Sequence, residues 1–328
     1  MNLFSRLNLN LLVILIVSFL DVSLAFSSEL PIQAAHKAFG EKKYLEVTEL
    51  LMPSLADLQK EEIVILGKSY GELNKPLLAV KVLSAGVSKF PGDSEIKSLL
   101  GYEQFKANNS AEAILTLKEV TDTDKKYQPA YEYLIQIFEK KQNRYELRLV
   151  YQDLLERVGE KPEFVAKMCE NCVLDSHYEL ALKYCQMGVS MLPTEPLSQV
   201  YLGLALRETG KTPEAEKQLK RTADSFSKSE LAQLTFAEHN ANKKNHIEAF
   251  KYFSRALKAN PKSTKAMIGI GVSGIEIQKL AEALSAFEKV CKIDKSSNLY
   301  FRRAINILKL AKNQTWLEKY EAAFDRCR

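Results

Sequence analysis

The sequence is poor in the residues that interrupt helices. Only 13 glycines and 10 prolines occur among 328 residues, and they form neither a low-complexity linker nor a β-hairpin signal. Apolar residues make up 46% of the chain and recur with helical spacing. The composition therefore predicts an all-α protein, for which one continuous domain is the simplest arrangement.

Catalytic motifs are lacking as well. The four histidines, His36, His177, His239 and His246, are scattered along the chain. Neither G-x-S-x-G nor H-E-x-x-H occurs, and no glycine-rich loop is suited to binding phosphate. Carboxylates are plentiful, but on helices they usually form a solvated face. We therefore expect a protein that is not an enzyme and that binds no cofactor.

The clearest helix pair lies between Pro196 and Ser229. An apolar helical run from Leu197 to Leu206 breaks at residues 208–211 and resumes at residues 213–219. This pattern predicts a helix, a tight turn and a second helix. Because so short a pair cannot bury its apolar faces alone, the neighbouring sequence is expected to repeat it.

The spacing of prolines and small residues reveals the repeat. Pro193 follows Pro91 by three times 34 residues and precedes Pro261 by twice 34. With starts at residues 60, 94, 128, 162, 196, 230, 264 and 298, position 8 of each repeat is mostly small, position 20 is mostly alanine, and position 24 is mostly large and apolar. Small residues let two helices approach, and the large ones fill the seam beside them. Position 8 holds Gly67, Gly101, Ile135, Cys169, Gly203, Ala237, Gly271 and Ile305; position 20 holds Ala79, Ala113, Leu147, Ala181, Ala215, Ala249, Ala283 and Leu317; position 24 holds Leu83, Leu117, Tyr151, Cys185, Leu219, Phe253, Phe287 and Glu321.

In this period and in these residue sizes the sequence resembles the tetratricopeptide repeat (TPR) family. A further first copy fits with a start near Ser28, two residues out of register, with Ala35, Val47 and Leu51 at the three positions. The resemblance implies about nine helix-turn-helix repeats in a single domain over residues 26–328. They would stack as antiparallel helix pairs in a right-handed α-α superhelix. The aromatic residue usual near position 4 is mostly absent.

Residues 1–25 have the three-part layout of a secretory signal peptide. Arg6 supplies an early positive charge, residues 11–20 are apolar, and the small residues Ser23 and Ala25 precede a cleavage site after Ala25. An uncleaved membrane anchor is the alternative, but about ten apolar residues fall short of the roughly 20 that a spanning helix needs. We therefore expect a periplasmic or secreted protein whose mature form does not span a membrane.

The charge is nearly balanced, with 46 basic and 41 acidic residues. Basic pairs such as Lys125-Lys126 and Lys243-Lys244 are isolated in the sequence. Nucleic-acid binding would need a concentrated basic stripe. We therefore expect proteins or peptide segments as partners and no nucleic acid, and a homo-oligomer remains open.

Three of the five cysteines fall within the fifth repeat. Cys169 and Cys172 form a C-x-x-C at positions 8 and 11 of its first helix, a spacing used by dithiol oxidoreductases and zinc sites. Cys185 lies at position 24 of the facing second helix. In an oxidising compartment Cys172 or Cys169 would bond to Cys185, and Cys172–Cys185 is the disulfide that we predict. Buried thiols and a zinc site that includes His177 are the alternatives.

Cys291 and Cys327 fall late in the second helices of the two last repeats. A second disulfide between them is a weaker expectation.

The resemblance also implies an extended concave face lined by the first helix of each repeat. Some TPR proteins bind a C-terminal carboxylate there with lysine, asparagine and arginine, but the corresponding positions of repeats six to eight are largely apolar. An apolar strip of this kind usually marks an interaction site; the alternative is that a tight superhelix or a homodimer buries the same residues. The predicted partner-binding residues are Leu197, Val200, Tyr201, Leu204, Leu231, Leu234, Ile268 and Val272, with Ile275 beside them.

Two functions follow from these features. The first is an exported scaffold or adaptor of the cell envelope that binds a partner segment along its concave face. The alternative is a thiol-dependent protein, redox or zinc, that uses the C-x-x-C at residues 169–172.

Overall fold

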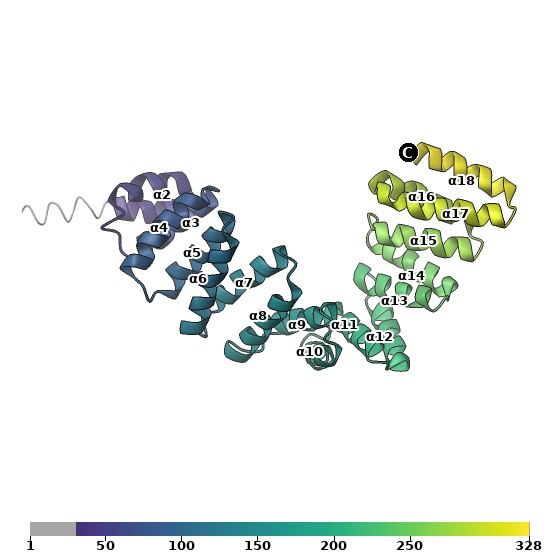
Figure 1. Ribbon diagram of the computed structural model, residues 1–328, viewed down its shortest axis with the longest axis horizontal. Coiled ribbons are helices and arrows are strands. Elements are labelled where there is room, and N and C mark those ends of the chain that lie inside the picture. The colour runs from purple at the N-terminus through teal and green to yellow at the C-terminus, as the bar shows by residue number, and fades with distance from the viewer. Residues whose placement is uncertain (1–30, 328) are drawn as a thin grey trace, which may run out of the picture. The chain divides into compact units, whose positions relative to one another are not determined.

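The protein, described here by a computed structural model over residues 31–327, is helical in all its regular elements (Figure 1). Residues 31–40 form a helix, which α2 (Tyr44–Leu51) and the short 3-10 helix η1 (Met52–Ser54) follow. The predicted signal peptide at residues 1–25 lies outside the described residues.

The helices then alternate between two lengths. In the repeats that start at residue 60 and later, the first helix has 13 residues and the second has 14, and all eight predicted starts coincide with the first residue of a first helix. The short helix η2 (Lys295–Ser297) comes before the last pair. The first helices are α3 (Lys60–Glu72), α5 (Ser94–Lys106), α7 (Gln128–Lys140), α9 (Pro162–Leu174), α11 (Pro196–Glu208), α13 (Glu230–Asn242), α15 (Thr264–Glu276) and α17 (Asn298–Leu310). The second helices are α4 (Pro76–Lys89), α6 (Ser110–Thr123), α8 (Arg144–Arg157), α10 (Tyr178–Met191), α12 (Thr212–Ser225), α14 (His246–Ala259), α16 (Leu280–Ile293) and α18 (Gln314–Cys327).

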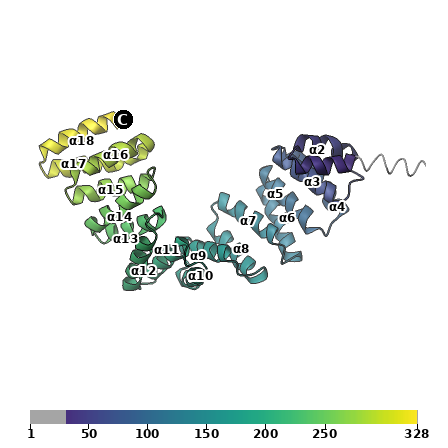
Figure 2. The same cartoon turned by 180° about the vertical axis from the view of Figure 1, so that it is seen from behind.

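The chain divides into two compact units. The N-terminal unit extends to Gly159 and the C-terminal unit begins at Glu160. Within each unit the helix pairs stack in chain order, as the two opposite views show (Figures 1 and 2). The stacked helix pairs confirm the predicted fold class, whereas a single continuous domain over residues 26–328 stays a prediction.

Each first helix ends in the same turn. Position 15 of every repeat has a positive φ, and glycine occupies it once, at Gly210. In that turn the Lys211 amide donates to the Leu206 carbonyl at 2.9 Å, and the Gly210 amide donates to Arg207 at 3.1 Å, which is the pattern of a Schellman motif. The residues at position 15 with a positive φ are Lys42, Asn74, Asn108, Gln142, Ser176, Gly210, Lys244, Gln278 and Lys312.

Positions 8 and 24 pack directly against each other. A Cβ atom placed on Gly67 would lie 2.6 Å from Leu83, and one placed on Gly101 would lie 2.7 Å from Leu117. The alanines at position 20 are fully buried in the same seam. The two helices of a pair are therefore close because position 8 has no side chain to hold them apart.

First helices of successive repeats also contact one another, from α3 through α17 within each unit. Among the second helices described, α16 and α18 make a comparable contact. Grooves therefore remain between other second helices on the outer face of each unit. No helix among residues 31–327 is long and apolar enough to cross a bilayer.

Candidate functional site

The predicted concave strip is only partly at the surface. Val200 is fully buried, and Tyr201 and Leu234 are 8% and 9% exposed. Leu197, Leu204, Ile268 and Val272 are half-buried, and Leu231 is exposed, whereas Ile275 is buried. The expectation of a contiguous exposed apolar strip was therefore wrong for Val200, Tyr201, Leu234 and Ile275.

Packing between first helices explains this difference. Helix α11 contacts α9 on one side and α13 on the other. Position 5, which holds Val200 and Leu234, consequently faces a neighbouring helix and not the solvent. Across the α9–α11 contact the Tyr201 hydroxyl donates to Glu170 Oε1 at 2.9 Å. This side chain therefore stabilises the packing of two successive first helices.

The concave aromatic residues of the N-terminal unit pack on each other. The rings of Tyr102 and Tyr133 stack with centroids 4.5 Å apart. Lys106 lies 5.6 Å from the Tyr102 centroid and donates to the Gly71 carbonyl at 2.9 Å. Burial raises the pKa of Tyr133. These groups tie α3, α5 and α7 together.

The cysteines form two disulfides. Cys169 bonds to Cys185, with Cα atoms 4.7 Å apart, and Cys291 bonds to Cys327. The predicted Cys172–Cys185 bond was therefore wrong, and Cys172 is buried outside both bonds. The reason is the position of each cysteine in the repeat. Position 8 faces position 24, as Gly67 and Leu83 show in the second repeat, whereas position 11, which holds Cys172, does not face position 24.

Neither chemistry proposed for the C-x-x-C is assembled in this structure. Because Cys169 bonds to Cys185, the motif has no pair of thiols. His177 is exposed and lies beside Asp175, whose backbone carbonyl is 2.8 Å from its Nδ1. Within the described chain, the group that could hold a metal is His36 with Glu61 and Glu62. It lies at the N-terminus of α3, where the helix dipole disfavours a cation.

Two grooves flank α14 on the outer face of the C-terminal unit. The basic groove between α12 and α14 has a volume of about 650 Å³ and is lined by Asp224, Ser227, Lys228, Arg255, Lys258 and Ala259. The apolar groove between α14 and α16 has a volume of about 480 Å³. Its apolar lining consists of Phe250, Leu257, Ile270, Ala281 and Ala286.

The negative charge of Asp224 is already compensated by hydrogen-bond and ion-pair partners inside the basic groove. The Tyr252 hydroxyl donates to its Oδ1 at 2.7 Å, and Arg255 lies 3.2 Å from the same oxygen. Burial opposes ionisation, but hydrogen bonds from Lys220, Tyr252 and Arg255 hold the pKa of Asp224 below its usual value. Burial and the adjacent carboxylate raise the pKa of Tyr252 to about 12. The lysines of this groove therefore supply its uncompensated charge.

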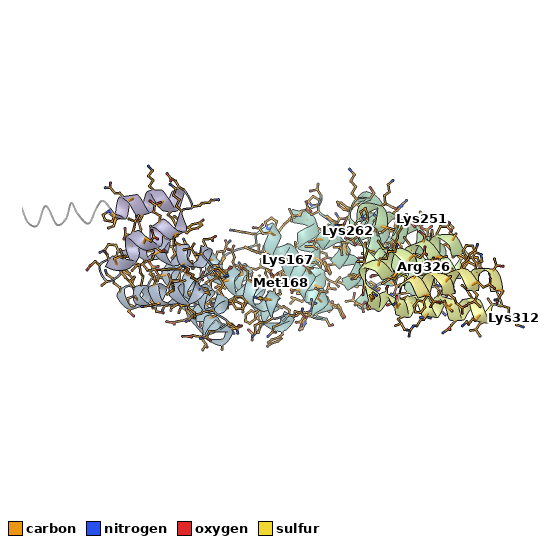
Figure 3. The ribbon with its side chains drawn as sticks, turned by 90° about the horizontal axis from the view of Figure 1, so that it is seen from above. Lys167, Met168, Lys251, Lys262, Lys312 and Arg326 are labelled. Atoms are coloured by element: carbon orange, nitrogen blue, oxygen red, sulfur yellow. A yellow bond between two sulfur atoms is a disulfide. The ribbon has the colours of Figure 1, made fainter. Side chains whose placement is uncertain are left out.

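The basic residues of three second helices share one outer surface. Positions 22, 26 and 29 lie on one side of a helix, because they are four and three residues apart. We call the basic residues at these positions of α12, α14 and α16 the basic outer face, of which Lys251 is labelled in Figure 3. Its members are Lys217, Arg221, Lys251, Arg255, Lys258, Lys289 and Lys292. The basic residues are thus more concentrated in the fold than the isolated basic pairs of the sequence suggest.

The same positions have the opposite character in the N-terminal unit. On α6 and α8 each set reads leucine, acid, acid, and Leu115 is 69% exposed while Leu149 is 38% exposed. We call these six residues the acidic outer face: Leu115, Glu119, Asp122, Leu149, Asp153 and Glu156. A groove of about 350 Å³ between α6 and α8 contains Leu149 and the acids of α8 in its lining.

Three solved structures align with this chain, and the first of them supports the fold. The C-terminal part of a TPR repeat-containing protein from Cytophaga hutchinsonii aligns with a TM-score of 0.59 at 16% identity, over 73% of this chain and 98% of that one. YrrB, a TPR protein with an unusual peptide-binding site, aligns at 17% identity and a TM-score of 0.45, over 56% of this chain and 95% of that one. A chain of the APC/C Cut9–Hcn1 hetero-tetramer aligns at 13% identity and a TM-score of 0.49, over 85% and 56% of the two chains.

Sequence comparison identifies the repeats directly. No curated protein matches the sequence. The tetratricopeptide repeat family matches residues 200–264 and 248–298. TPR proteins are protein-protein interaction scaffolds that are usually not catalytic. The family match covers residues 200–298, and the same 34-residue register extends over the pairs from α3 to α18, so the chain is a stack of tetratricopeptide-type repeats.

Proposed function

We propose that this protein is an exported scaffold of a cell envelope that holds a partner segment along the concave face of its C-terminal unit. The observation that carries the proposal is a row of apolar side chains that remain accessible on the first helices. These are Leu197, Leu204, Leu231, Ile268 and Val272. A scaffold role also fits the family, which binds proteins and peptides.

The buried neighbours of this row shape how it would bind. Val200 and Leu234 are buried between neighbouring first helices and cannot themselves contact a partner. An extended or helical segment would lie along the row with its apolar side chains between Leu204 and Leu231 and between Ile268 and Val272. Leu204, Ile268 and Val272 are already half-buried, so binding would immobilise them at little cost in side-chain entropy.

Two features support export to an oxidising compartment. The first is the signal-peptide pattern of residues 1–25. The second is the pair of disulfides, Cys169–Cys185 and Cys291–Cys327, because such bonds are rare where glutathione keeps thiols reduced. N-terminal sequencing of the protein recovered from the envelope fraction tests this part, and a chain that begins at Met1 in the cytoplasm would contradict it.

Capture from an envelope fraction tests the concave site. The variant Leu231→Glu with Val272→Glu places two charges in the row, and we expect it to lose the proteins that the wild type retains. The control, Leu45→Glu with Leu77→Glu, places the same charges on exposed leucines of the N-terminal unit and should retain them. If both variants capture the same proteins as the wild type, the site is not on this face.

A further inference from the structure

We propose that the basic outer face of the C-terminal unit binds the acidic outer face of the N-terminal unit of a second copy of this chain. The two faces differ from the concave row, so this inference is independent of the proposed scaffold function. It rests on three observations. The two faces have opposite charge, their charged residues recur with the same spacing, and exposed leucines on the acidic outer face are complementary to an apolar groove on the basic outer face.

The basic outer face retains charge that no described carboxylate neutralises. Lys251 pairs with Glu248, and Arg255 pairs with Asp224. Lys258, Lys289 and Lys292 are exposed and make no ion pair within residues 31–327. The C-terminal unit as a whole has 27 lysines and arginines against 20 acidic residues.

The acidic outer face has the complementary excess. Glu119 pairs with Lys97 at 2.8 Å, and Asp153 pairs with Arg157 at 3.0 Å. Asp122 remains 75% exposed at 4.0 Å from the same arginine. Glu156 is also exposed. The sequence up to Gly159 contains 19 basic and 21 acidic residues.

Both faces carry their charges on the same scaffold positions. Position 29 holds Asp122 and Glu156 in α6 and α8, and it holds Lys258 and Lys292 in α14 and α16. In each unit these two residues are 34 apart and stand on successive second helices. A row of two acids therefore meets a row of two lysines with a similar repeat spacing when the outer faces are placed together.

Apolar groups accompany the charges on both sides. Leu115, which is 69% exposed, and Leu149, which is 38% exposed in the lining of the groove between α6 and α8, lie at position 22 of the acidic outer face. On the basic outer face the apolar groove between α14 and α16 is recessed, with half-buried Phe250 and Leu257 and buried Ile270 in its lining. Exposed leucines on one face can cover the apolar groove of the other, and this contact would remove apolar surface from water.

This complementarity favours another protein surface over a polyanion. Neither a phosphate backbone nor a bilayer presents side chains that could enter a recessed groove. Glu248, Glu282 and Glu288 lie on the same helices as the lysines and would repel a uniformly negative surface. The sequence of the chain itself supplies a surface with both leucines and acids.

An interface of this kind joins two different faces, so each copy keeps one face available for another copy. Such heterologous contacts build rings or open chains. We therefore expect sedimentation velocity on the full mature chain to show species that grow with concentration. Because exposed charges are screened, association at about 20 mM salt should be at least tenfold tighter than at about 500 mM.

Charge reversal at position 29 provides the test. The acidic-face variant is Asp122→Lys with Glu156→Lys, and the basic-face variant is Lys258→Glu with Lys292→Glu. Each variant alone should weaken self-association about tenfold or more, because like charges then face each other. A chain with all four substitutions should associate again, since the rows are complementary with their signs exchanged.

Controls separate this interface from a general effect of charge. Lys125→Glu with Lys126→Glu lowers the net charge by as much as the basic-face variant does, on exposed lysines of the N-terminal unit that are not part of either face, and should not weaken association. The concave variant Leu231→Glu with Val272→Glu should also self-associate normally. Thermal melts would verify that every variant is folded.

The proposal fails if the wild type remains a monomer at all concentrations and salts. It also fails if either face can be reversed without effect, or if the folded fourfold variant does not regain association. Binding of the wild type to an oligonucleotide or to phosphatidylglycerol vesicles, without self-association, would assign the basic outer face to a polyanion instead.

Discussion

Cys169 of α9 and Cys185 of α10 form a disulfide at the two repeat positions where Gly203 faces Leu219 in the next repeat. The fifth repeat thus joins its two helices covalently, where its neighbour packs an apolar side chain over a glycine. The disulfide and the glycine–leucine contact therefore join the same two positions of the repeat.

Removing this bond should destabilise the C-terminal unit. Loop closure over a separation of 16 residues stabilises the fold by about 3 kcal/mol. We expect Cys169→Ala with Cys185→Ala to lower the free energy of unfolding by about this amount in chemical denaturation. Cys169→Gly with Cys185→Leu copies the next repeat and should recover part of the loss. If the glycine–leucine pair were no better than the alanine pair, the equivalence of the two contacts would be refuted.

A side chain at position 8 should separate the two helices of a pair. A Cβ atom on Gly203 would collide with Leu219, so Gly203→Leu should lower stability by about 1–3 kcal/mol or more. Gly92 has open space around it, and Gly92→Leu should change stability by less than about 0.5 kcal/mol. Thermal or urea unfolding of both variants measures the contrast, and equal effects would contradict the packing of this seam.

Substitutions at position 15 should act with opposite signs. Gln278 has a φ of 61°, a conformation that strains a residue with a Cβ atom. Gln278→Gly should therefore stabilise the protein by about 0.5 kcal/mol, after allowing for the larger entropy of glycine in the unfolded chain. Gly210, with a φ of 79°, should lose about 1 kcal/mol when replaced by alanine. A destabilising Gln278→Gly in urea titrations would show that the side chain matters more than the backbone.

His239 should make stability depend on pH. It is 3% exposed, and its Nε2 has no hydrogen-bond partner within the described chain. Desolvation lowers its pKa from the ordinary value of 6.5. Below about pH 6.5 the unfolded chain therefore protonates this histidine more readily than the folded protein does. The free energy of unfolding consequently decreases as the pH falls through this value.

The variant His239→Leu isolates this effect. We expect the free energy of unfolding of the wild type to decline more steeply than that of the variant between pH 7.5 and pH 5, the range below and around the ordinary pKa of about 6.5. Urea titrations at several pH values provide the comparison. Parallel pH profiles would mean that other groups cause the decline.

The candidate surfaces could be predicted less completely than the fold. The pattern placed Leu231 and Val200 on one concave strip, but contact between first helices buries Val200. The basic outer face recurs at positions 22, 26 and 29 of the second helices, and adjacency of basic residues in the chain does not show it. The 34-residue register is the signal that would have revealed it.

The sequence by itself determined the repeat register, because helix periodicity and turn residues are local. That register located the start of each first helix from residue 60 to residue 298 and the small residues of the seam. The tertiary structure decided which cysteine reaches Cys185, which concave side chains stay accessible, and that grooves remain beside α14. These depend on distances between helices of the same and successive repeats, and the pattern within one helix does not contain them.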